Sequence, residues 1–245
     1  MRFVNWSDWS LIEMRKLSLI IVFAVLANTG LAQENDYDYT TEAIWGINKN
    51  SASGLIGGVI FRLSRSIKPN HYRTLGLELI NVKHPAESRV VSRTGNYFVV
   101  GKTNHLFAIR GQYGRDIVLF KKAPQQGVQI TATGSVGPSI GLEAPYYIEY
   151  NQVVKEPYDP GIHQIENITG SGFIFQGLFQ SNLVLGVNVR AGLSFEFGTF
   201  KSNVSGFEVG MLLDAYARKI QMIPEADNYA VWPTVYITLF YGSRK

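Results

Sequence analysis

The stretch LVLGVNVRAGLSFEF, residues Leu183–Phe197, decides the fold. Apolar side chains occupy every second position, namely Leu183, Leu185, Val187, Val189, Ala191, Leu193, Phe195 and Phe197. The positions between them include Gly186, Asn188, Arg190, Gly192, Ser194 and Glu196. Side chains along a β-strand alternate between two faces. The stretch therefore predicts a strand with one hydrocarbon face and one polar face, and the class of protein depends on which face meets water.

The first residues predict export from the cytoplasm. Met14-Arg15-Lys16 is basic, residues 17–27 are apolar, and Ala32 ends a Gly-Leu-Ala sequence of the kind that signal peptidase cleaves. The apolar run is too short for a spanning helix, which needs roughly 20 residues. We interpret residues 14–32 as a signal peptide, residues 1–13 as a misassigned upstream start, and residues 33–245 as one barrel domain.

The composition excludes several classes of site. The 245 residues contain no cysteine, which rules out a disulfide scaffold, thiol nucleophiles and thiolate metal sites. With 23 Lys and Arg against 19 Asp and Glu, nothing indicates a nucleic-acid partner. No motif predicts a cofactor or a metal ion.

Alternating patterns like that of residues 183–197 recur along the chain. We expect further strands around residues 41–48, 55–64, 75–79, 107–113, 128–136, 207–216 and 234–241, about eight in all. The short β-rich runs Tyr97–Lys102 and Ile117–Lys121 leave ten strands as an alternative. Links after the second, fourth and sixth strands are shorter than those after the third, fifth and seventh, which is typical of an outer-membrane barrel.

Seven charged residues fall on the polar faces of these strands: Arg62, Glu78, Arg110, Arg190, Glu196, Glu208 and Asp214. If the apolar faces pointed inward, the protein would be a soluble periplasmic barrel with a ligand cavity. The polar faces are instead rich in glycine, which makes room inside a narrow eight-stranded barrel. We therefore expect the seven residues to form a charge cluster in the lumen, paired with one another because a lone buried charge is costly.

Several segments carry a resemblance to a known family. The segments GKTNHLF, LFKKAPQQGVQI and GPSIGLEAPYYIEY and the terminal TVYITLFYGSRK resemble the small outer-membrane β-barrel proteins common in Bacteroidetes, with an OmpA/OmpX-like barrel domain of mostly unassigned function. The resemblance implies an all-β, antiparallel, up-and-down transmembrane barrel in the outer membrane of a Gram-negative cell. It also implies contact with outer-membrane lipid and recognition by the barrel-assembly machinery, although Tyr236 departs from the glycine that the terminal signal prefers. It transfers no catalytic residues.

Three classes of function follow. The favoured prediction is a non-enzymatic structural or accessory envelope component, or a narrow porin-like channel. One alternative is a lipid hydrolase or acyltransferase with a rim site built from His105, Ser88 or Ser92, and Glu87. The other is the soluble ligand-binding barrel.

The segment from Gly141 to Asn182 is expected to be a long external loop that carries specific function. Phe173, Phe175, Leu178 and Phe179 form an apolar cluster in it. Such a cluster is expected to pack on the barrel rim, to plug the barrel mouth, to dock on an envelope protein partner, or to touch lipid.

Overall fold

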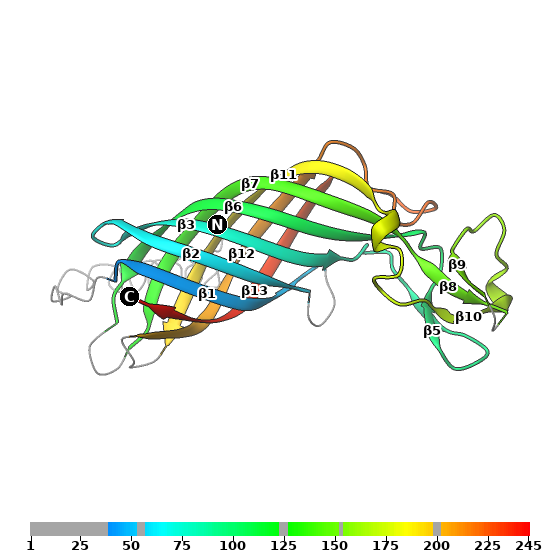
Figure 1. Ribbon diagram of the computed structural model, residues 1–245, viewed down its shortest axis with the longest axis horizontal. Coiled ribbons are helices and arrows are strands. Elements are labelled where there is room, and N and C mark those ends of the chain that lie inside the picture. Colours follow the sequence, from blue (N-terminus) through cyan, green and yellow to red (C-terminus); the bar gives the residue numbers. More distant parts are fainter. Residues whose placement is uncertain (1–38, 53–56, 123–126, 152–153, 198–201) are drawn as a thin grey trace, which may run out of the picture. The chain divides into compact units, whose positions relative to one another are not determined.

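Eight antiparallel strands pair side by side and close into a barrel in the computed structural model of this chain (Figure 1). The model describes residues 39–52, 57–122, 127–151, 154–197 and 202–245. The predicted upstream start and signal peptide lie outside these residues. The barrel strands are β1 (Thr41–Asn50), β2 (Gly58–Lys68), β3 (His71–Val82), β6 (Asn104–Phe120), β7 (Gln129–Pro145), β11 (Asn182–Phe197), β12 (Asn203–Tyr216) and β13 (Val231–Arg244).

The prediction of an antiparallel barrel with eight strands is confirmed. The ten-strand alternative is wrong, because β5 (Tyr97–Val99) pairs with β4 (Arg89–Val91) outside the barrel. Ile117 and its neighbours belong to β6, which pairs with both β3 and β7. The predicted strands were too short because β6 and β7 continue past residues that break the apolar pattern of the outward face, namely Arg115 and Pro138.

The links alternate in length around the barrel except for the first, 51–57, which is shorter than the link 121–128 on the other rim. The short-turn rim carries links 69–70, 121–128 and 198–202 together with the paired ends of β1 and β13, where Thr41 N–H donates to Lys245 O at 2.9 Å. The link between β2 and β3 has two residues, and Asn70 adopts φ 63°, a left-handed conformation that asparagine tolerates. The opposite, long-loop rim carries links 51–57, 83–103, 146–181 and 217–230.

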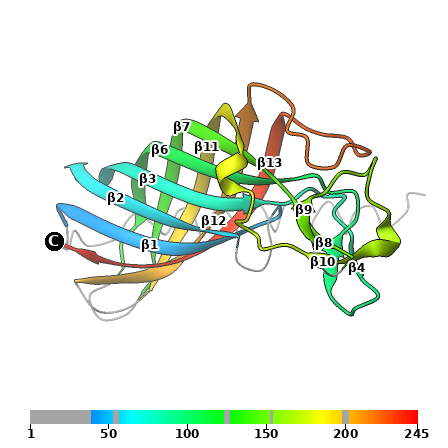
Figure 2. The same ribbon diagram turned by 45° about the vertical axis from the view of Figure 1, so that its right-hand side comes forward.

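Beyond the long-loop rim lies a small layer with secondary structure of its own, which we term the outer layer (Figure 2). It contains β4 and β5, a sheet of β8 (Tyr147–Tyr150), β9 (Val154–Pro157) and β10 (Ile168–Ser171), and the short 3₁₀ turns η2 (Ile165–Asn167) and η3 (Leu178–Gln180). The layer has its own apolar core, in which Phe98, Tyr146, Ile148 and Ile168 are buried. The expectation of a loop from Gly141 was therefore wrong, since β7 continues to Pro145 and the connection is structured.

The apolar faces of the barrel strands point outward. In β11, Leu183, Leu185, Val187 and Val189 are exposed, while the alternate residues Asn188 and Arg190 are buried inside the barrel. The same alternation leaves exposed aliphatic side chains on all eight strands, which together form what we term the apolar belt. A soluble barrel with an apolar cavity needs the opposite orientation.

Among the residues that the structure describes, no helix is long and apolar enough to cross a membrane.

Candidate functional site

Six of the seven predicted lumen charges form one continuous network in the middle of the barrel. They come from five strands and alternate in sign along the network, in the order Asp214, Arg110, Glu78, Arg190, Glu208, Arg62. Three arginines and three carboxylates balance in charge. All six are at most 7% exposed.

Close contacts hold together the charged side chains within each half of this network. Arg62 Nη1 lies 2.7 Å from Glu208 Oε2, and Arg190 Nη2 lies 3.0 Å from Glu208 Oε1. On the other side Arg110 Nε donates to Asp214 Oδ1 at 3.1 Å.

Glu78 links the two halves of the network. Its Oε2 lies 3.3 Å from Arg110 Nη1 and 3.4 Å from Arg190 Nη1. Charges buried in this way are tolerated only when each is paired and hydrogen-bonded. The chain meets this condition by bringing strands that are far apart in sequence to the same depth of the lumen.

The seventh predicted residue, Glu196, belongs to a second network at the short-turn rim. It binds Arg244, whose Nη1 lies 2.9 Å from Glu196 Oε1, and Lys122, whose Nζ lies 2.5 Å away. Arg244 also donates to Glu42 at 2.6 Å. The predicted single cluster is therefore two clusters, because Glu196 is the next-to-last residue of β11 and lies at the short-turn end of the strand.

Sequence reasoning missed several polar partners of these networks. Tyr236 donates its hydroxyl to Glu208 at 2.6 Å, and the Arg190 guanidinium lies 3.7 Å from its ring centroid. A Cβ at Gly192 or Gly210 would lie 2.4 or 2.6 Å from that hydroxyl, so these glycines leave space for it. The missed residues of the two networks are Asn48, Gln112, Ser139, Tyr236, Thr238, Glu42, Lys122 and Arg244.

The long-loop mouth of the barrel is closed by an apolar cap. Ile220, Met222 and Ile223, from the link between β12 and β13, pack on inward-facing side chains of the strand ends, including Val82 and Leu106. Met222 is completely buried, and its carbonyl accepts hydrogen bonds from Thr103 N–H at 2.9 Å and Asn104 N–H at 3.3 Å. The lumen is thus filled by the cap at one end, the arginine–carboxylate network in the middle and the Glu196 network at the other end.

The predicted loop plug does not lie in this mouth. Phe173 and Phe175 are exposed, Leu178 is half-buried, and Phe179 is 100% exposed. The Phe175 ring lies 5.6 Å from that of Phe107, which is on the outer wall between the inward-facing Leu106 and Ala108. The plug interpretation was wrong because apolar character alone does not distinguish a segment that fills the mouth from one that packs on the outside.

His105 and Glu87 of the imagined hydrolase site line one small cavity at the long-loop rim, but the described contacts of these two residues and of Ser92 do not join them into a catalytic arrangement. Glu87 binds Lys102 at 2.6 Å, and Ser92 Oγ donates to Thr169 O at 2.8 Å. His105 contacts Phe107 and Tyr146, and its Nδ1 is buried without a hydrogen-bond partner among the described residues. Among all the residues that the structure describes, no three His, Asp or Glu side chains are grouped so as to hold a metal ion.

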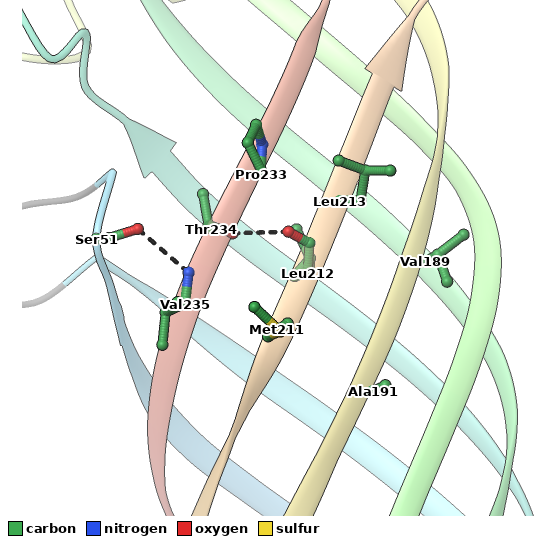
Figure 3. A pocket seen from close by; sticks show the side chains of 9 residues that line it. All are labelled: Ser51, Val189, Ala191, Met211, Leu212, Leu213, Pro233, Thr234 and Val235. Carbon is green, nitrogen blue, oxygen red and sulfur yellow. Dashed lines mark hydrogen bonds between the residues drawn. The ribbon is translucent and has the colours of Figure 1, made fainter. Parts of the chain in front are cut away.

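The outer wall has a shallow apolar depression of about 380 Å³ on β11, β12 and β13 (Figure 3). Val189, Ala191, Met211, Leu213 and Val235 line it with apolar side chains.

No family model and no curated protein matches this chain. Among solved structures, Ail, the attachment invasion locus protein of Yersinia pestis, in complex with the heparin analogue sucrose octasulfate, is similar with 9% identity and a TM-score of 0.42; the match covers 85% of this chain and 100% of that chain. Neisserial surface protein A is similar with 11% identity and a TM-score of 0.39, covering 84% of this chain and 96% of that chain.

Proposed function

We propose that this chain is an integral outer-membrane protein whose barrel serves as a closed, non-enzymatic structural or accessory component of the envelope. The observation that carries the proposal is the apolar belt, which surrounds a closed barrel with six paired charges buried inside it. The outward-facing charges of the strands, Lys49, Arg65, Arg73 and Arg115, lie toward the two rims. A water-soluble protein seldom exposes an apolar patch of more than a few hundred Å², whereas a membrane barrel needs an outward apolar band about 25 Å tall.

Strand length supports the same proposal. A strand that crosses a bilayer needs about 9–11 residues when it is tilted by about 45°, and the shortest barrel strand, β1, has 10. The 17 residues of β6 and β7 exceed this requirement, so these strands would carry the outer layer above the membrane surface. The signal peptide expected at residues 14–32 agrees with export to that membrane.

The filled lumen favours a structural role over a channel. An eight-stranded barrel leaves an interior just wide enough for side chains, and here buried ion pairs and an apolar cap occupy it. Outer-membrane lipid would be the permanent partner, the assembly machinery would recognise β13 during insertion, and the outer layer would offer a surface for an envelope protein.

Cell fractionation followed by gel migration with and without boiling tests the proposal. We expect recovery of the protein in the outer membrane, extraction only with detergent, and faster migration of the unboiled sample. Recovery in the soluble periplasm without a heat-dependent shift would contradict it.

A further inference from the structure

A cleft with several charged lining residues lies on the outer wall of the barrel at the long-loop rim. It encloses about 230 Å³ between the ends of β3 and β6, the β4–β5 hairpin and the segment that precedes η3. Asn81 and His105 line it from the outer wall, because their neighbours Ile80, Val82 and Leu106 point into the barrel. We term this feature the rim cleft.

The rim cleft has an excess of positive charge. Its charged lining residues are Lys83, Arg89, Lys102 and Glu87. Glu87 is already engaged, since its Oε1 accepts from Lys102 Nζ at 2.6 Å and from His84 N–H at 3.1 Å. Lys83 and Arg89 make no ion pair with any residue in the described ranges, so their charges are available to a ligand.

Two further observations indicate that a polar ligand would fit. His105 lines the cleft, and its Nδ1 is buried without a hydrogen-bond partner in the part of the chain described, so as an N–H it can donate to an anion. Burial, opposed by Glu87, lowers the pKa of Lys102, and the positive charges of Lys83 and Arg89 lower that pKa further. An anion in the cleft would relieve this repulsion.

The wall on the membrane side of the cleft is apolar. Asn81 pairs across the sheet with Phe107, and Leu79 and Ile109 form the next outward pair. Phe175 packs on Phe107, and Phe173 packs on Phe175 with ring centroids 5.7 Å apart. Ile174, between Phe173 and Phe175, lines the cleft, so this aromatic cluster lies beside the basic cleft and adjoins the apolar belt.

We propose that the rim cleft binds the phosphate headgroup of an anionic lipid in the leaflet on the long-loop side, with Lys83 and Arg89 on the phosphate and the acyl chains along Phe107 and Phe175. Arginine and lysine bind phosphate through charge-assisted hydrogen bonds. Aromatic rings are common where a barrel meets the headgroup level. The inference rests on the proposed function, because it needs the apolar belt to lie in a bilayer.

The test uses the full barrel in nanodiscs of phosphatidylcholine that contain phosphatidylglycerol, with native mass spectrometry to count the anionic lipid retained. The double variant Lys83→Gln, Arg89→Gln should retain phosphatidylglycerol about tenfold more weakly, as expected for the loss of charge-assisted hydrogen bonds. The matched control, Arg93→Gln with Lys155→Gln, removes two charges from exposed positions of the outer layer that do not line the cleft. It should retain the lipid like the unmodified protein.

The variant Phe175→Ser distinguishes a lipid from a free anion. It should weaken retention of phosphatidylglycerol while leaving the weak competition by inorganic phosphate unchanged. Equal losses in the cleft variant and the control, or inorganic phosphate competing as tightly as the lipid, would overturn the inference. Every variant is first checked for its heat-dependent gel shift, so that failure of the barrel itself, which would contradict the proposed function, is seen separately.

Discussion

Glu208 shows how single residues hold the lumen together. Its carboxylate accepts hydrogen bonds from the side chains of Arg62, Arg190 and Tyr236, and it is almost fully buried. Two of the three partners are cations. Its one negative charge is therefore shared by two buried guanidinium groups, of which that of Arg190 also contacts Glu78.

The variant Glu208→Gln should destabilise the barrel by about 3–5 kcal/mol, because removing one partner of a buried pair leaves the other charge uncompensated. Urea unfolding in lipid vesicles measures the change. Glu225→Gln, at an exposed position of the link between β12 and β13, is the matched control and should change stability little. Equal stability of the two variants would show that the Glu208 contacts do not stabilise the barrel.

Substitutions at two exposed residues test whether the outer wall lies in lipid or in water. Met211 on the outer wall is 69% exposed, and Tyr97 in the outer layer is 63% exposed. If the apolar belt lies in a bilayer, Met211→Arg should cost about 2–4 kcal/mol, the cost of arginine at the bilayer midplane, and Tyr97→Arg should cost close to nothing. The same unfolding assay in vesicles compares them. A similar small effect at both sites would mean that both face water.

At the scale of elements, the link between β12 and β13 forms the apolar cap, which Met222 anchors. We expect Met222→Ala to lower the free energy that holds the cap in place by about 2–5 kcal/mol, the usual loss of stability when a buried methionine is truncated. Hydrogen exchange at the Thr103 and Asn104 amides, which donate to the Met222 carbonyl, should then become at least about tenfold faster. Amides in the middle of β12 should keep their protection.

The control for the cap is Ile162→Ala, which truncates an apolar side chain that is 73% exposed in a different link. It should leave exchange at Thr103 and Asn104 unchanged. If hydrogen exchange at Thr103 and Asn104 is unchanged in Met222→Ala as well, the assignment of the apolar cap to this link is contradicted.

Strand alternation is the part of the fold that could be read from the sequence. Residues 183–197 predicted both faces of β11 correctly, because a period of two holds wherever one face is apolar and the other polar. The outer layer could not be predicted in this way. Its strands β8, β9 and β10 have four residues each, which is too short for a clear period.

Pairing across the lumen was also beyond the sequence. The alternation predicted that Arg190 and Glu196 point inward, but the depth of each side chain depends on the stagger between neighbouring strands. For this reason Glu196 pairs with Arg244 and not with Arg190. The inward direction of Tyr236 and Arg244 was available from the same alternation, since both share the parity of Thr234 and Thr238.

At the scale of the whole molecule, the filled lumen predicts that the barrel does not conduct ions. Planar bilayers that contain the purified protein should show no steady current above that of lipid alone, because ion pairs and the apolar cap occupy the path. Stable, reproducible conductance steps would contradict a closed lumen and would favour the narrow channel.

The central claim is that the odd-numbered residues of 183–197 face lipid and the even-numbered residues face the lumen. Because the chain has no cysteine, single cysteines at positions 185–193 can each carry one spin label without further changes. Accessibility to oxygen, which dissolves in lipid, and to a water-soluble nickel chelate is then measured in vesicles. The account predicts that labels at 185, 187, 189, 191 and 193 are accessible to oxygen and protected from the chelate. High accessibility of those positions to the chelate would contradict it, because the apolar face would then meet water.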